Sequence, residues 1–376
     1  MTKPVIAIVG LGTMGAGIAQ TFAAAGHTVL MFDGHLETLG SAPARIAAGL
    51  EPLVAKGKLA PPDRDALLAR LRPVQTLDDL APATLIIEAI AERIEAKQAL
   101  FATLESIAAP DAILATNTSS LSVTTIAQGL AHPERLLGLH FFNPAPVMRL
   151  VELIGHAGTA PHALARARAL TEATGKTVIL APDTPGFLVN RLARPYYGEA
   201  LAMLAEGTPA QTIDAAMRAA GYRLGPFQLI DLIGADINLA ATESLFAAMN
   251  HHPRYHPFDA LRAQVASGHL GNKSGQGFVH PDPVTSAPDT PAPDTAIQTR
   301  IEATLVNEGL WLAHDSATAP ADIDSALTLG LNLPQGPFAL LTTLGEPAVR
   351  HALADLEAAA PPHLAGRYLM PPRKQP

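Results

Sequence analysis

The glycine-rich stretch near the start of the chain most strongly constrains the fold. Val5–Val9 is a short apolar run typical of a buried strand, and the sequence GLGTMG follows it directly. Gly10, Gly12 and Gly15 thus lie between this strand and a helix expected over Ala16–Ala25. Glycines at this spacing allow a tight turn and let a pyrophosphate approach the helix N-terminus. The stretch predicts a dinucleotide-binding α/β unit.

A second strand, expected over Thr28–Phe32, ends at Asp33. A carboxylate at this point can accept hydrogen bonds from a ribose and would repel a 2′-phosphate, so we predict NAD rather than NADP. Residues 4–32 contain no charged side chain. The glycines nevertheless interrupt the apolar run well before the roughly 20 residues that a membrane span needs. We therefore expect a cytoplasmic protein with no membrane partner.

Composition excludes several classes of function. The 376 residues can form two or three domains, and the absence of cysteine rules out disulfides and thiolate metal sites. A net charge of −8 without a basic stripe argues against a nucleic-acid partner. We expect no metal site, because His251 and His252 precede Pro253 in a predicted loop without a set of carboxylates.

Polar residues follow two further predicted strands, Thr84–Glu88 and Ala112–Thr116. Ligands of an open parallel sheet bind beyond the carboxyl ends of its strands, which places Glu92, Lys97 and Ser119 at the crevice. Lys97 is expected on a helix over residues 94–107. The alternative for the serines is helix capping, because Ser119 or Ser120 could cap a helix beginning near Val123.

The segment 36–72 is predicted to form two helices with Pro61 and Pro62 between them. Its basic side chains could contact the phosphates of a coenzyme A substrate, although a solvated helix surface explains most of them better. These side chains are Arg45, Lys56, Lys58, Arg64, Arg70 and Arg72.

His140 and Glu152 lie in apolar runs at positions 138–152, where a charged side chain needs a partner. An imidazolium formed during proton transfer is the partner that best explains the carboxylate. We interpret His140 as a general base and Glu152 as the group that orients it. The alternative is a packed histidine and a surface glutamate.

The chain resembles the L-3-hydroxyacyl-CoA dehydrogenase family through five motifs over residues 4–279. These are GLGTMG at 10–15, EAIAE at 88–92, NTSSL at 117–121, GLHFFNPAPVMRLVEL at 138–153 and DTPGFLVNR at 183–191. The resemblance implies that His140 is the catalytic base, Glu152 its partner, and Ser119 and Asn190 substrate contacts. It also matches Asp33, Glu92, Lys97, Ser119 and Asn143 to positions that contact NAD.

We predict an α/β Rossmann-type domain followed by an all-α domain that is repeated in tandem. The boundaries are 1–184 for the NAD-binding domain, 185–280 for the first helical copy, 281–297 for a proline-rich linker and 298–376 for a degenerate second copy. Asp183-Thr184-Pro185 is interpreted as a helix start. The repeat rests on echoes at offsets of 109, 110 and 111 residues, such as Gly225-Pro226-Phe227 and Gly336-Pro337-Phe338.

The resemblance implies an enzyme that interconverts L-3-hydroxyacyl-CoA and 3-ketoacyl-CoA with NAD, as in fatty-acid β-oxidation. Its partners are then an acyl-CoA thioester and either an internal pseudo-dimer within a monomer or a homodimer, because single-copy relatives dimerise through the helical domain. Two alternatives remain: a dehydrogenase of a free hydroxy acid or sugar acid, and a non-catalytic nucleotide-binding protein on the same scaffold.

Overall fold

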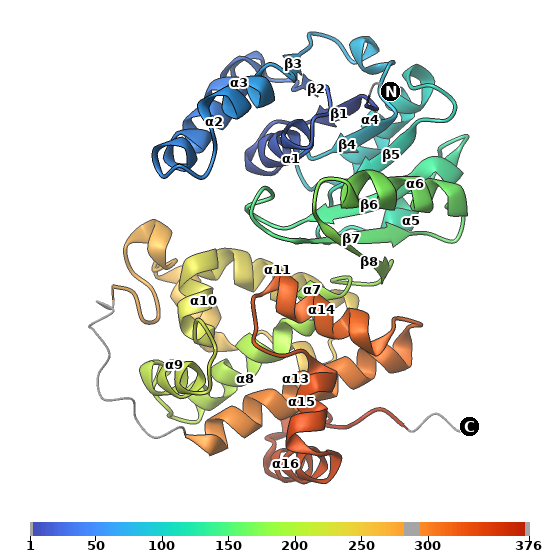
Figure 1. The fold of residues 1–376 in the computed structure, drawn as a ribbon. Coiled ribbons are helices and arrows are strands. Elements are labelled where there is room, and N and C mark those ends of the chain that lie inside the picture. Colours follow the sequence, from blue (N-terminus) through green and yellow to red (C-terminus); the bar gives the residue numbers. More distant parts are fainter. Residues whose placement is uncertain (1–2, 282–293, 373–376) are drawn as a thin grey trace. The chain divides into compact units, whose positions relative to one another are not determined.

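The computed structural model describes residues 3–281 and 294–372, and the chain divides into two compact units (Figure 1). The first unit, Met1–Thr184, layers helices on both faces of a sheet, and the second, Pro185–Pro376, is helical in its described parts. This confirms the predicted fold class, an α/β Rossmann-like unit followed by a helical one.

Eight strands form the sheet of the first unit, in the order β3-β2-β1-β4-β5-β6-β7-β8. All neighbouring strands run parallel except β6 and β7, which are antiparallel. The strands are β1 (Ile6–Val9), β2 (Val29–Phe32), β3 (Leu71–Pro73), β4 (Leu85–Glu88), β5 (Ile113–Thr116), β6 (Leu136–Phe141), β7 (Leu150–Gly155) and β8 (Thr177–Pro182). Strands β1, β4 and β5 are buried along their whole length, which is why they read as continuous apolar runs.

Two hydrophobic cores hold helices to opposite faces of this sheet. One core contains apolar residues of α1, α2 and α6, and the other contains those of α4 and α5. The helices of the first unit are α1 (Thr13–Ala24), α2 (Leu36–Ala55), α3 (Pro61–Leu68), α4 (Ile94–Ile107), α5 (Val123–Ala127) and α6 (Pro161–Glu172). Helices on both faces leave the carboxyl ends of the strands as the open edge of the unit.

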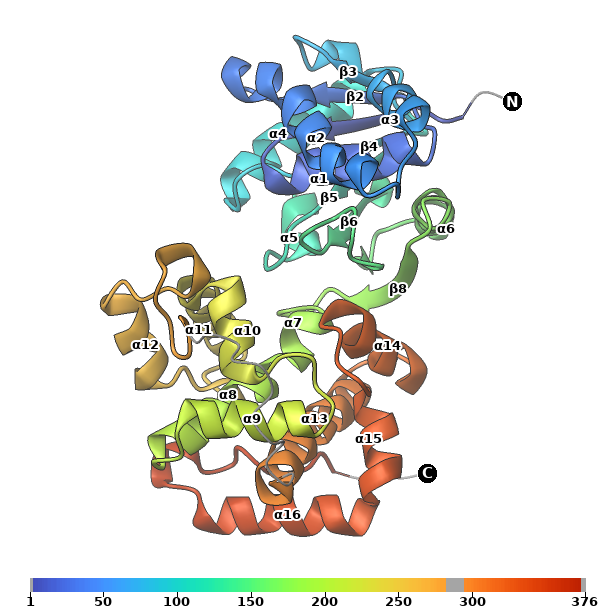
Figure 2. The same ribbon diagram turned by 60° about the vertical axis from the view of Figure 1, so that its left-hand side comes forward.

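The helical unit consists of a first helical segment, residues 185–281, and a second helical segment, residues 294–372. In the second segment the long helix α13 packs against α8 of the first segment (Figure 2). The helices are α7 (Val189–Leu192), α8 (Arg194–Ala205), α9 (Ala210–Ala219), α10 (Pro226–Ile233), α11 (Ala235–Ala248), α12 (Asp259–Ala266), α13 (Thr295–Asp315), α14 (Pro320–Gly330), α15 (Pro337–Leu344) and α16 (Glu346–Ala359).

Two reciprocal clusters of charges join these helical segments. In one, Glu308 of α13 is bound by Arg191 at 2.7 Å, Arg254 at 3.1 Å and Tyr255 at 2.6 Å, all from the first segment. In the other, Glu199 of α8 is bound by three groups of the second segment. These are Arg300 at 2.7 Å, Arg367 at 3.3 Å and Tyr368 at 3.0 Å. Each carboxylate is thus neutralised by the segment to which it does not belong.

The same helix cap recurs in both segments. The Asp214 carboxylate accepts hydrogen bonds from the amides of Phe227 and Gln228 at the start of α10. The Asp324 carboxylate accepts from Phe338 and Ala339 at the start of α15 in the same way. Both pairs satisfy amides that have no partner within their own helix. This agreement supports the predicted tandem repeat, which stays a prediction.

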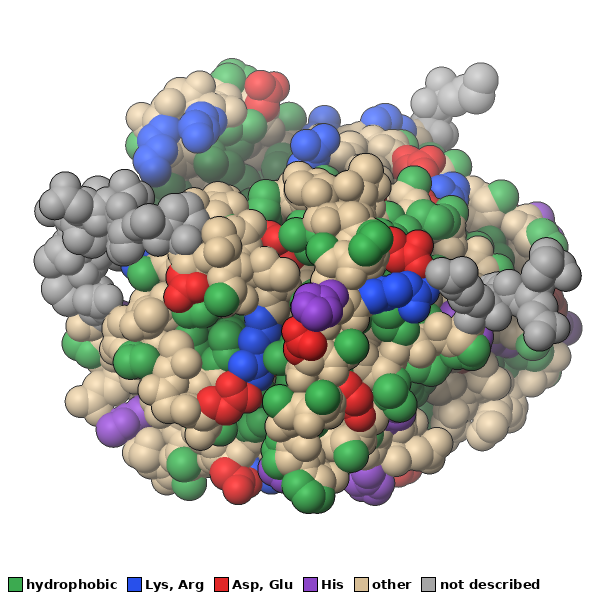
Figure 3. All heavy atoms as spheres, turned by 90° about the horizontal axis from the view of Figure 1, so that it is seen from below, with side chains coloured by type: hydrophobic (Ala, Val, Ile, Leu, Met, Phe, Trp, Pro, Cys, Tyr) green, Lys and Arg blue, Asp and Glu red, His purple; other side chains and the backbone are tan. Residues whose placement is uncertain are grey.

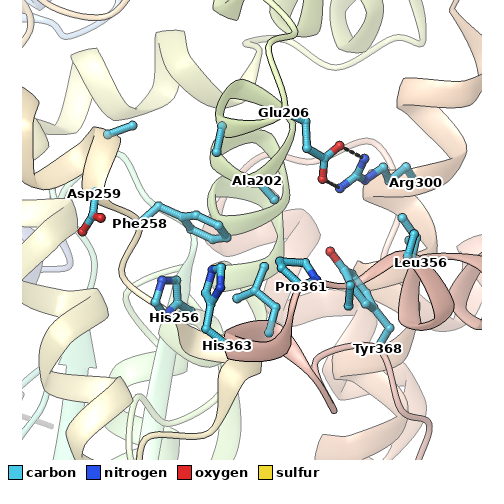
Figure 4. Close-up of a pocket in the computed structure, with 15 residues that line it drawn as sticks. Ala202, Glu206, His256, Phe258, Asp259, Arg300, Leu356, Pro361, His363 and Tyr368 are labelled. Carbon is cyan, nitrogen blue, oxygen red and sulfur yellow. Dashed lines mark hydrogen bonds and ion pairs between the residues drawn. The ribbon is translucent and has the colours of Figure 1, made fainter.

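The two clusters differ in how the space beside them is filled. A cavity of about 500 Å³ lies beside the pair of Arg300 and Glu206, with small Ala202 and the ring of Phe258 in its wall (Figure 4). Trp311 stands 109 residues after Ala202, and its indole packs 4.3 Å from the Arg254 guanidinium. The indole also donates to the Leu369 carbonyl, so its bulk fills the place beside the other cluster.

Charges of both signs are mixed on one face of the described surface. On the face shown in Figure 3, acidic and basic side chains are interspersed among apolar ones. No helix within residues 3–281 or 294–372 has the length and apolar character needed to cross a membrane.

Some local predictions were wrong or incomplete. Asp183 does not start a helix of its own, because α7 begins only at Val189; its carboxylate accepts from the Val123 and Thr124 amides at the start of α5. The predicted two-helix segment 36–72 also hid an edge strand, β3. Of the predicted linker 281–297, residues 282–293 lie outside the described residues and 295–297 already belong to α13.

The substitution Glu199→Gln should lower the free energy of unfolding by about 3–5 kcal/mol, because it leaves the buried Arg367 and the partly buried Arg300 facing a neutral side chain. Urea unfolding followed by circular dichroism measures this. Arg350→Gln is the control, since it removes an exposed pair with Glu346 that is worth less than about 1 kcal/mol. Equal effects of the two substitutions would contradict the role given to the buried cluster.

Candidate active site

His140 and Glu152 face each other across the one antiparallel junction of the described sheet. They are direct partners in the β6–β7 register, so their side chains leave the same face of the sheet. His140 Nδ1 lies 2.6 Å from Glu152 Oε2, and the two residues are 6% and 0% exposed. A carboxylate oxygen beside Nδ1 favours the tautomer that carries its proton on that nitrogen. This geometry is compatible with the predicted pair of a general base and its orienting group, which stays a prediction.

The strand that carries His140 is fixed at its end. The Asn117 side chain, at the end of β5, accepts a hydrogen bond of 2.8 Å from the Phe141 amide. The Phe142 ring lies beside the imidazole, with 4.4 Å between their centroids. His140 is therefore held by a neighbouring strand, a carboxylate and an aromatic ring.

The glycine turn after β1 has the shape that a dinucleotide requires. Gly10 has a φ of +91° and lies against Ala89, where a Cβ would come within 2.6 Å of the carbonyl oxygen. A Cβ on Gly15 would lie 1.8 Å from the Gly10 oxygen. A Cβ on Gly12, in contrast, would meet no protein atom within 4 Å. The open side of the turn at Gly12 leaves room for a pyrophosphate at the N-terminus of α1.

Asp33 lies at the end of β2 beside this turn. Its carboxylate accepts hydrogen bonds from the Leu11 amide at 2.7 Å and the His35 amide at 2.8 Å. These bonds hold the carboxylate next to the glycine turn, and each oxygen can accept a further bond from a ribose hydroxyl. The residues present thus fit NAD.

A buried ion pair lies at the carboxyl end of β4. Lys97 of α4 lies 2.5 Å from Glu88 at the end of β4, and both side chains are almost fully buried. Thr116, on the neighbouring strand, donates to the other Glu88 oxygen at 2.7 Å. Lys97 also reaches Glu92 at 3.2 Å. Its ammonium group is therefore held inside the unit by two carboxylates.

Glu92 organises the loop that follows β5. One of its oxygens accepts from the Thr118 hydroxyl and from the Ser119 and Ser120 amides, at 2.5–3.2 Å. Burial acts to raise the pKa of the Glu92 carboxyl, but the Lys97 charge and these hydrogen bonds outweigh it and hold the pKa below its ordinary value. Glu92 is thus ionised at neutral pH and fixes the position of Ser119.

The structure brings most of the predicted residues to one edge of the first unit. His140, Glu92, Ser119 and Asn143 all lie at or just beyond the carboxyl ends of strands β4, β5 and β6; of these, Glu92 and Ser119 were expected there. Asn190 belongs to α7 of the other unit. The roles of these residues remain predictions.

Several of the predicted basic contacts have partners within the unit. Arg45 donates to the Leu11 carbonyl, Arg70 to the Ala23 carbonyl, and Arg64 pairs with Glu51 and Asp65. Arg45 therefore supports the glycine turn from outside. These contacts explain three of the six charges without a ligand.

Two functional contacts were missed by the sequence reasoning. Glu88 lies inside the quoted EAIAE motif, but its pairing with Lys97 requires knowledge of how α4 packs. Ser122, rather than Ser119 or Ser120, caps α5 by accepting from the Thr125 amide. Its position directly before Val123 was the signal available in the sequence.

Two family profiles cover almost the whole chain. The profile described as "3-hydroxyacyl-CoA dehydrogenase, NAD binding domain" matches residues 5–184. The profile described as "3-hydroxyacyl-CoA dehydrogenase, C-terminal domain" matches residues 186–280 and 297–372.

Individual relatives agree with these profiles. The 3-hydroxyadipyl-CoA dehydrogenase of Escherichia coli K12 is 47% identical over 72% of this chain, which spans 58% of that protein's length. A probable 3-hydroxybutyryl-CoA dehydrogenase of Bacillus subtilis is 39% identical over 75% of this chain and 98% of its own. The crystal structure of 3-hydroxybutyryl-CoA dehydrogenase from Escherichia coli K12 superposes with a TM-score of 0.90 at 34% identity, covering 98% of this chain and 97% of that one.

Two glycine substitutions separate cofactor binding from folding. Gly12→Ala should fold normally, because its Cβ meets no protein atom, yet should weaken NADH binding by about tenfold or more by filling the pyrophosphate space. Gly15→Ala should instead destabilise the fold by about 1–3 kcal/mol, since it clashes with the Gly10 carbonyl. Fluorescence titration with NADH and thermal unfolding measure the two effects. Unchanged NADH affinity in Gly12→Ala would contradict the assignment.

Proposed function

Because the chain belongs to the 3-hydroxyacyl-CoA dehydrogenase family, we propose that it oxidises L-3-hydroxyacyl-CoA thioesters to 3-ketoacyl-CoA and catalyses the reverse reduction. The observation that carries this proposal is the buried 2.6 Å contact between His140 and Glu152 at the carboxyl edge of an NAD-binding unit. A packed histidine needs no buried carboxylate at this distance.

In the proposed reaction His140 removes the proton from the 3-hydroxyl while the C3 hydrogen leaves as hydride. Bound NAD⁺ supplies the acceptor for that hydride. Glu152 keeps the imidazole in the tautomer that accepts a proton at Nε2 and then stabilises the imidazolium that forms. In the reverse direction the same imidazolium returns the proton to the ketone oxygen.

We assign Ser119 and Asn190 to hydrogen bonds with substrate oxygens, and Asp33, Glu92, Lys97 and Asn143 to the surroundings of NAD. The support for Ser119 is its amide bond to Glu92, which fixes the loop after β5. The support for Asp33 is its place beside the glycine turn. We also place the reaction in the cytoplasm, in line with the absence of cysteine from the chain.

His140→Ala should lower turnover by roughly 10²- to 10⁴-fold, the usual contribution of a positioned general base, without weakening NADH binding. The assay follows NADH consumption with acetoacetyl-CoA, and free acetoacetate and NADPH serve as control substrates. His162→Ala, which removes an exposed histidine on α6, should leave turnover unchanged.

Wild-type turnover in His140→Ala would remove this residue from the catalytic role. Turnover of free acetoacetate as fast as that of the thioester would instead favour the dehydrogenase of a free hydroxy acid. NADH binding without any turnover would favour the non-catalytic scaffold.

We further propose that the second helical segment takes the place of a partner subunit, as an internal pseudo-dimer. The reciprocal clusters at Glu199 and Glu308 support this, because a two-fold interface repeats each contact in both directions. A chain ending at residue 281 lacks the arginines that neutralise Glu199, so we expect it to dimerise or to lose solubility and activity. Light scattering measures its mass; a monomeric, soluble and fully active fragment would contradict the proposal.

A further inference from the structure

Lys176 is a buried cation that the proposed chemistry does not use. It lies in the turn between α6 and β8 and is only 8% exposed. Its ammonium donates hydrogen bonds of 2.6 Å each to the backbone carbonyls of Ala145 and Met148. Burial lowers the pKa of Lys176 from its ordinary value, since both acceptors are neutral. A long apolar side chain would fill this position without that desolvation cost, so the two carbonyl contacts need an explanation.

Both carbonyls belong to the loop 142–149, which joins the strand of His140 to the strand of Glu152. The loop rests on the helix that follows the glycine turn: a Cβ on Gly17 would lie 3.1 Å from Pro146 and 3.2 Å from Ala145. The amides of residues 147 and 148 both bond back to the Pro144 carbonyl, which closes the loop into a compact turn. Lys176 therefore links two backbone carbonyls in the middle of this turn through its ammonium group.

The two residues at the start of the loop lie close to His140 in the sequence and close to the proposed reaction site. Phe142 packs beside the His140 imidazole, and Asn143 is exposed just beyond the carboxyl end of β6. In an open parallel sheet the cofactor crosses that edge, from the glycine turn after β1 towards the later strands. A shift of the loop would therefore move the Phe142 ring that packs on His140 and the Asn143 side chain that we assign to the surroundings of NAD.

We propose that Lys176 is a positioning residue for hydride transfer, which acts by fixing the loop 142–149 through the Ala145 and Met148 carbonyls. This inference rests on the proposed function. Lys176 touches neither cofactor nor substrate in this scheme: it acts on Phe142 and Asn143 through the backbone. A misplacement of about 1 Å at a reacting group costs on the order of 100-fold in rate, so a loosened loop has a measurable effect.

The test compares Lys176→Met, which keeps the length and removes the donors, with Lys176→Arg, which restores them. Arg168→Met is the matched control, because Arg168 also donates to a backbone carbonyl in this unit, but to that of Val178 in β8 rather than to a carbonyl of the loop. The measurements are thermal unfolding, NADH affinity by fluorescence, kcat and KM with acetoacetyl-CoA, and the isotope effect on kcat with NADH deuterated at the transferred position.

Well below its unfolding temperature, Lys176→Met should lower kcat by roughly 10- to 100-fold and raise the isotope effect, because poor alignment makes hydride transfer rate-limiting. Lys176→Arg should recover a large part of the loss, and Arg168→Met should stay within about twofold of wild type. If Lys176→Met does not fold, Lys176→Gln takes the same measurements.

The inference is overturned if the Met variant loses thermal stability while kcat, NADH affinity and the isotope effect stay at wild-type values. It is equally overturned if the Arg variant is as slow as the Met variant. Inactivity of the wild-type protein towards acetoacetyl-CoA would contradict the proposed function instead. NADH affinity would then remain as a readout of the loop, and its loss in Lys176→Met would support only the part of the inference that Lys176 fixes the loop 142–149.

Discussion

The buried pair of His140 and Glu152 depends on a single reversal of chain direction in an otherwise parallel sheet. Because β7 runs antiparallel to β6, residues 140 and 152 become direct partners and share a face. Their neighbours Leu139, Phe141 and Val151 point to the opposite face and into the hydrophobic core. A slip of one residue in this register would place the imidazole in that core. The apolar residues that stabilise the sheet therefore also hold the polar pair in register.

Three other buried carboxylates also depend on partners from other parts of the chain. Each is paired with a cation from another helix or segment. Glu88 meets Lys97 from the following helix, while Glu199 and Glu308 meet arginines from the opposite helical segment. An unpaired buried carboxylate would cost far more than a hydrogen bond returns, so each pair makes its two elements depend on each other. These pairs mainly determine which helices and strands pack together. Their net contribution to the free energy of unfolding is small, although breaking one is costly.

The local sequence pattern was sufficient to predict those turns, strands and helices that depend only on residues close in the chain. The glycine turn, the strand ending at Asp33 and the helix over 94–107 follow from short-range periodicity and backbone freedom. The cap given by Asp183 to α5 could not be predicted, since it joins residues about 60 positions apart. A Thr-Pro sequence looked like a helix start, whereas the carboxylate before it serves another helix. Long-range partners were predicted only where function demanded one, as at His140.

The helical unit shows that the two segments of the predicted repeat need not be packed alike. Arg191 and Arg300 stand 109 residues apart, an offset of the predicted repeat, and each binds a carboxylate of the other segment through Nε at 2.7 Å. Beside the Glu308 cluster the Trp311 ring covers Arg254, whereas beside the Glu199 cluster the small Ala202 lines a cavity. The charged contacts tolerate little change, because removing either partner strands a buried charge. The apolar positions around them can exchange a large side chain for a small one at the cost of a cavity. Divergence between the segments is therefore expected first in the packing beside the clusters and last in the clusters themselves.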